Sequence, residues 1–205
     1  RCFMVNLVGK KTIDFNCNAV LSDGSIVKDF NFYKNIDNKY ALLFFYPMDF
    51  TFVCPTELIS INNRIDEFKS KNVEVIAVSI DSHYVHRAWK EYPLEKGGLG
   101  NNVSFTMVSD VKREIIKLYD VEDDISGVSY RASFLIDENK LIRVKHVNDF
   151  SIGRNIDEYL RLFDALIFNK KHGNVCEAGW FSGSKGLQPN LIGISEYLKD
   201  NFKKL

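Results

Sequence analysis

Cys54 ends an octet, PMDFTFVC at 47–54, whose residue types and spacing could activate a thiol. The apolar run at 41–46 comes directly before it and predicts a buried strand, and apolar residues with helical spacing follow at 56–70. A cysteine at such a junction faces the unpaired N–H groups of the first helical turn, which together with the helix dipole favour the thiolate. Thr51 lies three residues back, near enough in a tight loop to place its hydroxyl beside the sulfur. The pattern predicts a nucleophilic cysteine.

The octet resembles the Pro-x-x-x-Thr-x-x-Cys signature of the peroxiredoxins, and FTFVCPTE at 50–57 is similar to their typical two-cysteine class. The resemblance implies that Cys54 is the peroxidatic cysteine, whose thiolate attacks a peroxide oxygen and becomes a sulfenic acid. It also implies that Thr51 hydrogen-bonds the thiolate and the peroxide, that Pro47 shields the site from water, and that Arg131 stabilises the thiolate and holds the peroxide. A lone cysteine is more often a small buried hydrophobe, but the whole octet in this context favours chemistry.

Two further charged residues match a supporting network of the family. Arg131 lies in the segment YRASF, and the resemblance implies that Glu57 and Arg154, the latter in Ile-Gly-Arg, orient its guanidinium. A fixed guanidinium stabilises a nearby thiolate in any protein. The alternative for Glu57 and Arg154 is a structural ion pair, because such pairs also perturb and position charges.

Cys176 lies in the segment GNVCEAGW at 173–180, which resembles the resolving-cysteine motif of the family, usually Val-Cys-Pro-Ala. Glu177 replaces the proline, a change that alters the stiffness of the tail because proline fixes its own φ. The resemblance implies that Cys176 of one subunit attacks the sulfenic acid of the other. An obligate homodimer with an intersubunit Cys54–Cys176 disulfide follows, in some relatives arranged as a ring of five dimers. The alternative is a spare thiol on a flexible tail.

Local unfolding must precede that disulfide, because Cys54 has to leave its helix and the region around Cys176 has to unravel. Relatives that are prone to over-oxidation pair Gly-Gly-Leu-Gly with a C-terminal Tyr-Phe. Here the first motif is present at 97–100, but the second reads Tyr197-Leu198. Since loss of an aromatic anchor loosens packing, we expect intermediate sensitivity to over-oxidation.

The elements that position these residues alternate between strands and helices. We expect strands at 41–46, 73–80, 105–108, 131–137 and 141–147, and helices at 56–70, 82–91 capped by Ser82, 111–119 capped by Asp110, 155–168 and 194–203. In the helix at 111–119, Ile115, Ile116 and Leu118 are expected to face inward. This order predicts an α/β protein with a mixed central sheet flanked by helices, and the resemblance implies a thioredoxin-like fold. We expect a main domain over 1–170 and an extended C-terminal tail over 171–205.

Composition excludes several classes of function. The 205 residues contain 27 basic and 27 acidic side chains, a balance that argues against nucleic-acid binding and suits an uncharged peroxide. No apolar run approaches the roughly eighteen residues of a membrane span. Four cysteines without a Cys-x-x-Cys pair or zinc-like spacing fit a reducing compartment and predict neither metal nor cofactor. Because the chain starts at Arg1, we expect a mature mitochondrial form, with a cytoplasmic protein as the alternative.

The remaining cysteines, Trp89 and the histidines are expected to take no part in the chemistry. Cys2 and Cys17 match no motif, Trp89 is expected in the core or an interface, and the four histidines, which show no ligand spacing, are expected to be surface or satisfied residues: His83, His86, His146 and His172.

The leading hypothesis is a thioredoxin-dependent peroxidase for hydrogen peroxide and small organic hydroperoxides, serving antioxidant defence and redox homeostasis. Without a Cys-x-x-Cys pair of its own, the chain must take electrons from a partner, and the two-cysteine resemblance implies thioredoxin. A Cys–His hydrolase is a second hypothesis, which needs a histidine base near Cys54. A third is an oligomeric chaperone or peroxide sensor, whose holdase activity would survive Cys176→Ser.

Overall fold

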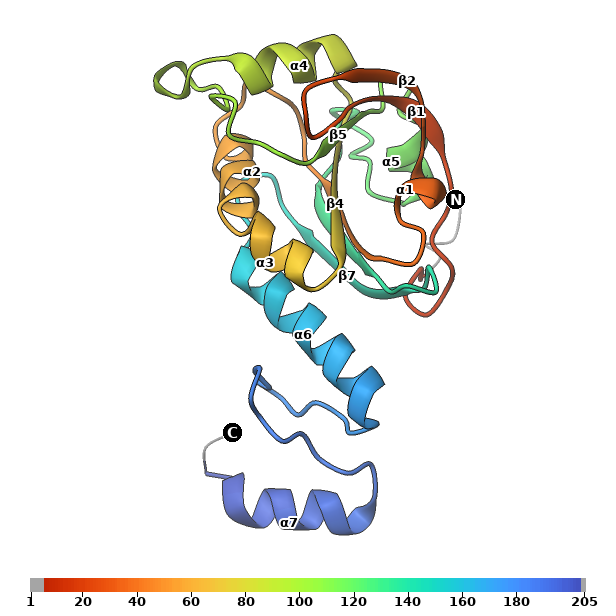
Figure 1. Cartoon of the computed structure of the whole chain (residues 1–205), viewed down its shortest axis with the longest axis vertical. Helices are drawn as coiled ribbons and strands as arrows, with labels where there is room; N and C mark the ends of the chain where they lie inside the picture. The colour runs from red at the N-terminus through yellow and green to blue at the C-terminus, as the bar shows by residue number, and fades with distance from the viewer. Residues whose placement is uncertain (1–5, 204–205) are drawn as a thin grey trace. The chain divides into compact units, whose positions relative to one another are not determined.

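The computed structural model describes residues 6–203, which form a mixed sheet of seven strands flanked by helices (Figure 1). The strands are β1 Asn16–Val20, β2 Ile26–Asn31, β3 Tyr40–Phe45, β4 Val73–Ser79, β5 Thr106–Ser109, β6 Arg131–Ile136 and β7 Ile142–Asn148. Their order across the sheet is β2-β1-β5-β4-β3-β6-β7. The β3–β4 and β4–β5 pairs are parallel, and the other pairs are antiparallel. The predicted mixed α/β sheet is confirmed.

Seven α-helices occur among the described residues. They are α1 Phe32–Asn35, α2 Cys54–Asn62, α3 Ile65–Ser70, α4 His83–Glu91, α5 Glu114–Leu118, α6 Ile156–His172 and α7 Leu191–Asn201, with a short 3₁₀ helix at Leu94–Lys96. Figure 1 shows α2, α3 and α4 on one side of the sheet and α1 and α5 on the other. Among the described residues, no helix has the length and apolar character needed to cross a bilayer.

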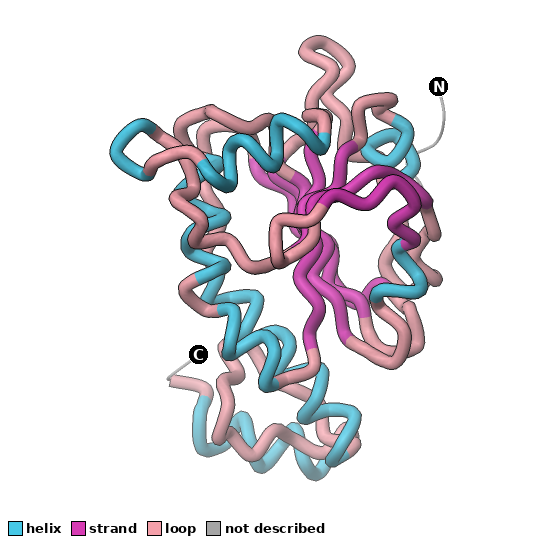
Figure 2. The backbone as a smooth tube through the Cα atoms, turned by 45° about the horizontal axis from the view of Figure 1, so that its top comes forward, coloured by secondary structure: helices cyan, strands magenta, loops and turns pink. Residues whose placement is uncertain are grey.

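The described residues form two compact units, one ending at Ile156 and the other starting at Asp157. The first unit contains the whole sheet and α1 to α5; the strands run through its centre in Figure 2. The second contains the rest of α6, the tail and α7. Within it, Val175 and Leu187 exchange two backbone hydrogen bonds of 2.9 Å each, which close the loop that carries Cys176. The division at 170 that we expect from the sequence remains a prediction.

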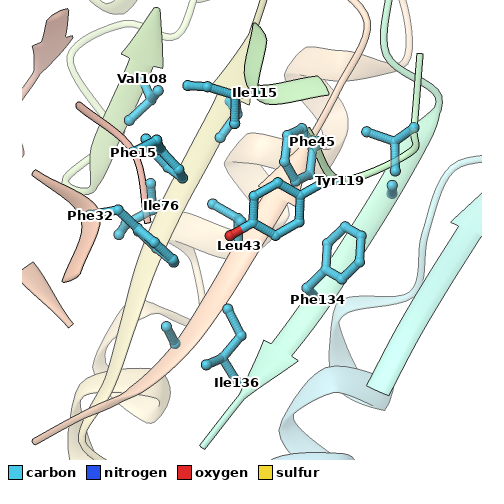
Figure 3. Packing of buried hydrophobic residues seen from close by; sticks show 14 of the residues in the cluster. Phe15, Phe32, Leu43, Phe45, Ile76, Val108, Ile115, Tyr119, Phe134 and Ile136 are labelled. Atoms are coloured by element: carbon cyan, nitrogen blue, oxygen red, sulfur yellow. The ribbon is translucent and has the colours of Figure 1, made fainter. Parts of the chain in front are cut away.

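A hydrophobic core with several aromatic rings lies between the sheet and the two helices α1 and α5 (Figure 3). The rings of Phe15 and Phe32 stack at 4.7 Å between centroids, and Phe45 meets Phe134 edge-on at 5.7 Å. All six residues of β3 are buried, as expected for a central strand that has β4 on one side, β6 on the other and both faces covered. This packing fixes the carboxyl end of β3, where the Cys54 loop begins.

The N-terminal hairpin is an element that the sequence did not predict. We expect the first clear strand at 41–46, but β1, β2 and α1 precede it. β2 lies at the edge of the sheet, and its segment IVKDFN exposes Lys28 and Asp29. Because an edge strand need not bury alternate residues, the period-two pattern is weak there.

The single helix predicted at 56–70 is wrong, because the chain forms two helices. α2 starts two residues earlier, at Cys54, and ends at Asn62, and α3 starts at Ile65. At the break the side-chain oxygen of Asn62 accepts hydrogen bonds from the backbone and hydroxyl of Ser104, at 2.8 and 2.9 Å. Asn62 and Asn63 are weak helix formers, and the helix ends there. The helical spacing of apolar residues therefore continues across a turn in which the backbone is not helical.

The helix near 111–119 is shorter than expected. α5 starts at Glu114, so Asp110 is not its N-cap residue, although its carboxylate accepts from the backbone N–H groups of Glu114 and Ile116 at 3.0 and 2.8 Å. The prediction that Leu118 faces inward is also wrong, since it is 46% exposed. The inward place is taken by Tyr119, one turn after the buried Ile115.

Other predicted elements are confirmed. Ser82 caps α4 through a 3.3 Å hydrogen bond from the Val85 N–H, and β6 and β7 form the expected antiparallel hairpin. The helix expected at 155–168 is confirmed and continues to His172. Trp89 is fully buried, and its indole N–H donates to the Gly97 carbonyl at 2.9 Å, so its predicted place in the core is confirmed.

Candidate active site

The Cys54 loop leaves the sheet at the edge where the parallel strands β3 and β4 end. Val53 precedes α2, Cys54 is its first helical residue, and Pro55 follows at a position where a missing N–H breaks no helical hydrogen bond. Cys54 is fully buried, and Pro47 at the start of the loop is also buried. The sulfur therefore lies at the start of a helix, out of contact with bulk water.

Arg131 comes to this edge because β6 runs antiparallel to β3. The register pairs Phe44 with Ser133, so Arg131 at the first position of β6 lies beyond the end of β3. Its Nη1 donates to the Cys54 Sγ at 3.4 Å, and its Nε donates to the Phe150 carbonyl at 2.7 Å. The guanidinium is 4% exposed and held in one orientation.

Glu57, one turn after Cys54 on α2, is the carboxylate that joins the two arginines. Its Oε2 accepts from Arg131 Nη1 and Arg154 Nη2, and its Oε1 accepts from the backbone N–H and Nε of Arg154, each at 2.9 Å. Burial alone would raise the pKa of Glu57, but the hydrogen bonds and charge of Arg154, with the charge of Arg131, lower it below its ordinary value. Glu57 is therefore ionised.

Arg154 links this cluster to the sheet. Its Nη1 donates to the carbonyl groups of Phe45 and Ala132 at 2.9 and 2.8 Å, and its guanidinium lies 3.3 Å from the centre of the Phe44 ring. Two buried guanidinium groups and one carboxylate leave one unbalanced positive charge. An uncompensated buried charge is costly, and a thiolate at Cys54 balances it. The guanidinium of Arg131 places a positive charge directly beside Sγ.

Thr51 is the predicted site residue whose contact differs from the expected one. Its hydroxyl donates to the Met48 carbonyl at 2.9 Å, which closes a turn within the loop. Because that proton is engaged, the Thr51 oxygen has lone pairs left to accept a hydrogen bond from an incoming hydroperoxide. Within residues 6–203, Sγ accepts a hydrogen bond from Arg131, and the Thr51 hydroxyl makes none to it.

The sequence did not identify three residues that anchor the loop: Tyr46, Asp49 and His86. Their side chains form a buried hydrogen-bonded group behind the loop. Asp49 occupies a variable position of the signature. His86 could have been found by its place one turn before the buried Trp89, where a polar residue on the inward face of a helix needs a partner.

The second unit positions Cys176. The thiol is half-buried and lies 3.6 Å from the Ala165 carbonyl of α6. Burial raises the pKa of Cys176, the charge of Glu177 raises it further, and Arg161 opposes both. With its loop in this conformation, Cys176 is a protonated thiol at neutral pH.

Of the other two cysteines, the structure describes Cys17. Cys17 is half-buried, and burial together with the charge of Asp110 raises its pKa to about 12. It is therefore unreactive at neutral pH, as expected for a bystander. Cys2 lies outside the described residues.

Replacing Glu177 with Gln should speed the attack of Cys176 on an oxidised partner. Removing the neighbouring negative charge lowers the pKa of Cys176, so a larger fraction is thiolate at neutral pH. We expect the rate of disulfide formation after one peroxide equivalent to rise about two- to threefold at pH 7, measured by rapid acid quench and mass spectrometry. Glu196→Gln, an exposed change in the same unit, is the control. Equal rates for both variants would contradict the role of the Glu177 charge.

Comparisons with known proteins agree with this geometry. The AhpC/TSA family model matches residues 8–145. Alkyl hydroperoxide reductase C of Helicobacter pylori is 47% identical over 199 residues, 97% of this chain and 100% of its own length. Peroxiredoxin-1 of Gallus gallus is 46% identical over 93% of this chain and 94% of its own. The crystal structure of reduced Plasmodium vivax 2-Cys peroxiredoxin superposes with a TM-score of 0.91 at 43% identity, covering 95% of this chain and all of that one.

A thioredoxin-like sheet that holds a buried cysteine against a fixed guanidinium defines a thiol-dependent oxidoreductase. This chain belongs to the AhpC/TSA family of peroxiredoxins. It is a thiol peroxidase with an antioxidant function, as the resemblance of the octet implies.

Proposed function

We propose that this chain reduces hydrogen peroxide and small organic hydroperoxides through Cys54, resolves the product with Cys176 of a second subunit, and is recycled by thioredoxin. The observation that carries the first step is the 3.4 Å contact between Arg131 Nη1 and the buried Cys54 Sγ. The name of the Helicobacter pylori relative, alkyl hydroperoxide reductase, supports hydroperoxides as substrates. The two-cysteine type of the Plasmodium vivax relative supports a resolving role for Cys176.

In the first step the Cys54 thiolate attacks the terminal peroxide oxygen. The O–O bond breaks as the S–O bond forms, and the leaving hydroxide or alkoxide takes a proton and departs as water or an alcohol. Negative charge moves from sulfur to the leaving oxygen. The Arg131 guanidinium can stabilise this charge on either atom without moving, because Glu57 and the Phe150 carbonyl hold it in place. No reorganisation is therefore needed during the reaction.

In the second step the Cys176 thiolate attacks the sulfenic sulfur, an S–S bond forms, and hydroxide leaves as water. Cys54 is fully buried in the first turn of α2, so that turn must unwind before the thiol of Cys176 can reach its sulfur. A dithiol such as that of thioredoxin then reduces the disulfide through a mixed disulfide. This cycle requires a homodimer, and a ring of dimers is compatible with it.

The hydrolase hypothesis has a chemical obstacle in this site. A cysteine hydrolase needs a base that takes a proton from the thiol and returns it to the leaving group. The hydrogen-bond partner of Sγ is the Arg131 guanidinium, which stays protonated and cannot serve as that base. The arrangement suits a pre-formed thiolate and a peroxide instead.

Turnover with thioredoxin, thioredoxin reductase and NADPH tests the proposal. We expect the wild type to consume NADPH continuously with hydrogen peroxide, and Cys54→Ser to consume none. Cys176→Ser should reduce about one peroxide per chain and then stop, because its sulfenic acid has no resolving thiol. Sustained thioredoxin-dependent turnover by Cys176→Ser would refute the resolving role of Cys176.

A further inference from the structure

A row of residues on α6 lies along the part of the tail that carries Cys176, here called the Cys176 segment (residues 174–180). The row consists of Arg161, Ala165 and Asn169, and its four-residue spacing puts the three on one face of the helix. The thiol of Cys176 faces the middle of the row, where its sulfur lies 3.6 Å from the Ala165 carbonyl oxygen. A thiol is a weak hydrogen-bond donor, so this contact by itself holds the segment only loosely.

The two ends of the row hold the segment more firmly, because each donates to a main-chain carbonyl group. The side-chain amide of Asn169 donates to the Asn174 carbonyl at 2.8 Å. Arg161 Nη1 donates to the Trp180 carbonyl at 2.6 Å. Cys176 lies between these two contacts in the sequence. The segment therefore runs antiparallel to α6 and is held on both sides of the cysteine.

The Arg161 end is the stronger of the two. Glu158, one turn earlier on α6, accepts from Arg161 Nε and Nη2 at 2.6 and 2.7 Å. A carboxylate that binds two nitrogens in this way fixes the plane of the guanidinium, so Nη1 stays directed at the Trp180 carbonyl. The ring of Trp180 also packs against Phe168, with centroids 5.0 Å apart. A charged hydrogen bond and ring packing thus hold this end, whereas a neutral amide holds the other.

We propose that Arg161 and Asn169 hold the Cys176 segment against α6 and so set how often its thiol is free to attack. Within the described residues, neither side chain hydrogen-bonds to the Cys176 sulfur, so both are positioning residues. The inference rests on the proposed resolution by Cys176. While the segment is held, the thiol stays on α6, and once the segment is released, the thiol can reach Cys54 of the partner subunit.

Asn169→Ala tests the amide end. Alanine removes the donor to the Asn174 carbonyl, but it is a better helix former than asparagine, so α6 itself is not weakened. One neutral hydrogen bond corresponds to about a fivefold change in an opening equilibrium. We therefore expect hydrogen exchange at 174–180 of the reduced protein, and disulfide formation after one peroxide equivalent, each to quicken about fivefold. Asn35→Ala removes a matching amide–carbonyl bond from the first unit and should change neither rate.

Arg161→Met tests the charged end. A charge-assisted hydrogen bond is stronger than a neutral one, so we expect both rates to rise about tenfold. Attack takes place from the released segment, where the charge of Arg161 no longer acts on the thiol, so disulfide formation should follow the exchange. Arg161→Lys keeps the charge but lacks the planar fork that binds Glu158 and the Trp180 carbonyl together, and its rates should lie between those of wild type and Arg161→Met.

The first step of the reaction separates release of the segment from general loosening. The rate at which peroxide oxidises Cys54, measured by rapid acid quench and mass spectrometry, should be the same in wild type and in every variant of Arg161 and Asn169. A fall in that rate that accompanies the faster exchange would show that the variants disturb the whole protein, and would overturn the assigned role.

Exchange and resolution together decide the proposal. Unchanged exchange at 174–180 in Asn169→Ala and Arg161→Met would overturn it, and so would faster exchange with an unchanged rate of disulfide formation. Asn169→Ala decides alone if Arg161→Met does not fold. Exchange in the reduced protein does not depend on the chemistry of Cys176. A wild type that forms no Cys54–Cys176 disulfide would therefore overturn the proposed function, while exchange still shows whether the two side chains hold the segment.

Discussion

Replacing Arg131 with Met slows the reaction of Cys54 with hydrogen peroxide by about 10²- to 10³-fold, the usual cost of removing one pre-organised donor from a site where charge develops. Arg131 Nη1 donates to Sγ, and the guanidinium charge stabilises negative charge on the sulfur. Methionine fills similar space but supplies neither charge nor hydrogen bond. Stopped-flow measurement of tryptophan fluorescence during peroxide addition gives the rate constant.

Two further variants make this result specific. Arg131→Lys keeps the charge but cannot reach the Phe150 carbonyl, Glu57 and Sγ together, so it should restore little of the rate. Arg143→Met removes an arginine of β7 that pairs with Asp137 and is 41% exposed, and it should leave the rate unchanged. A rate for Arg131→Met within threefold of the Arg143→Met rate would contradict the role of Arg131.

Glu57→Gln is the change with the largest expected effect on stability. It leaves two buried guanidinium groups without their carboxylate, and removal of one partner from a buried ion pair costs about 3–5 kcal/mol. Arg131 also loses the group that orients it, so the peroxide rate should fall together with the stability. Urea unfolding followed by circular dichroism measures the free energy of unfolding.

An exposed ion pair supplies the control for Glu57→Gln. Arg87 and Glu91 pair at 3.1 Å on α4 with both side chains more than half exposed, so Glu91→Gln should cost at most about 0.5 kcal/mol. Equal losses of stability in the two variants would show that the buried cluster contributes no more than a surface pair. The stability of the Glu57 variant should also recover in part when Arg154 is replaced by Met, since one unpaired charge is then removed.

The sequence predicts the elements around Cys54 well because local signals define them. The apolar run of β3, the octet and the proline after Cys54 all act over a few residues. The same holds for the serine cap of α4 and for the hairpin of β6 and β7. These elements carry Cys54 and Arg131, so most of the site could be located before the fold was known.

What the sequence did not predict depends on contacts between distant residues. The hairpin of β1 and β2 is held by pairing at the edge of the sheet rather than by its own pattern. The burial of His86 depends on Asp49, 37 positions earlier, and on the Val108 carbonyl, 22 positions later. The orientation of Glu57 toward both arginines likewise requires β6 to lie beside β3, which pairing at a distance determines.

One measurement tests the central claim most directly: intact mass and mobility on a non-reducing gel, before and after one equivalent of hydrogen peroxide. Wild type is compared with Cys54→Ser and Cys176→Ser. We predict a disulfide-linked dimer that appears with peroxide in the wild type alone, with peptide mapping that joins Cys54 to Cys176. A wild type that stays monomeric while Cys54 is oxidised, or a dimer that persists in either variant, would contradict the account.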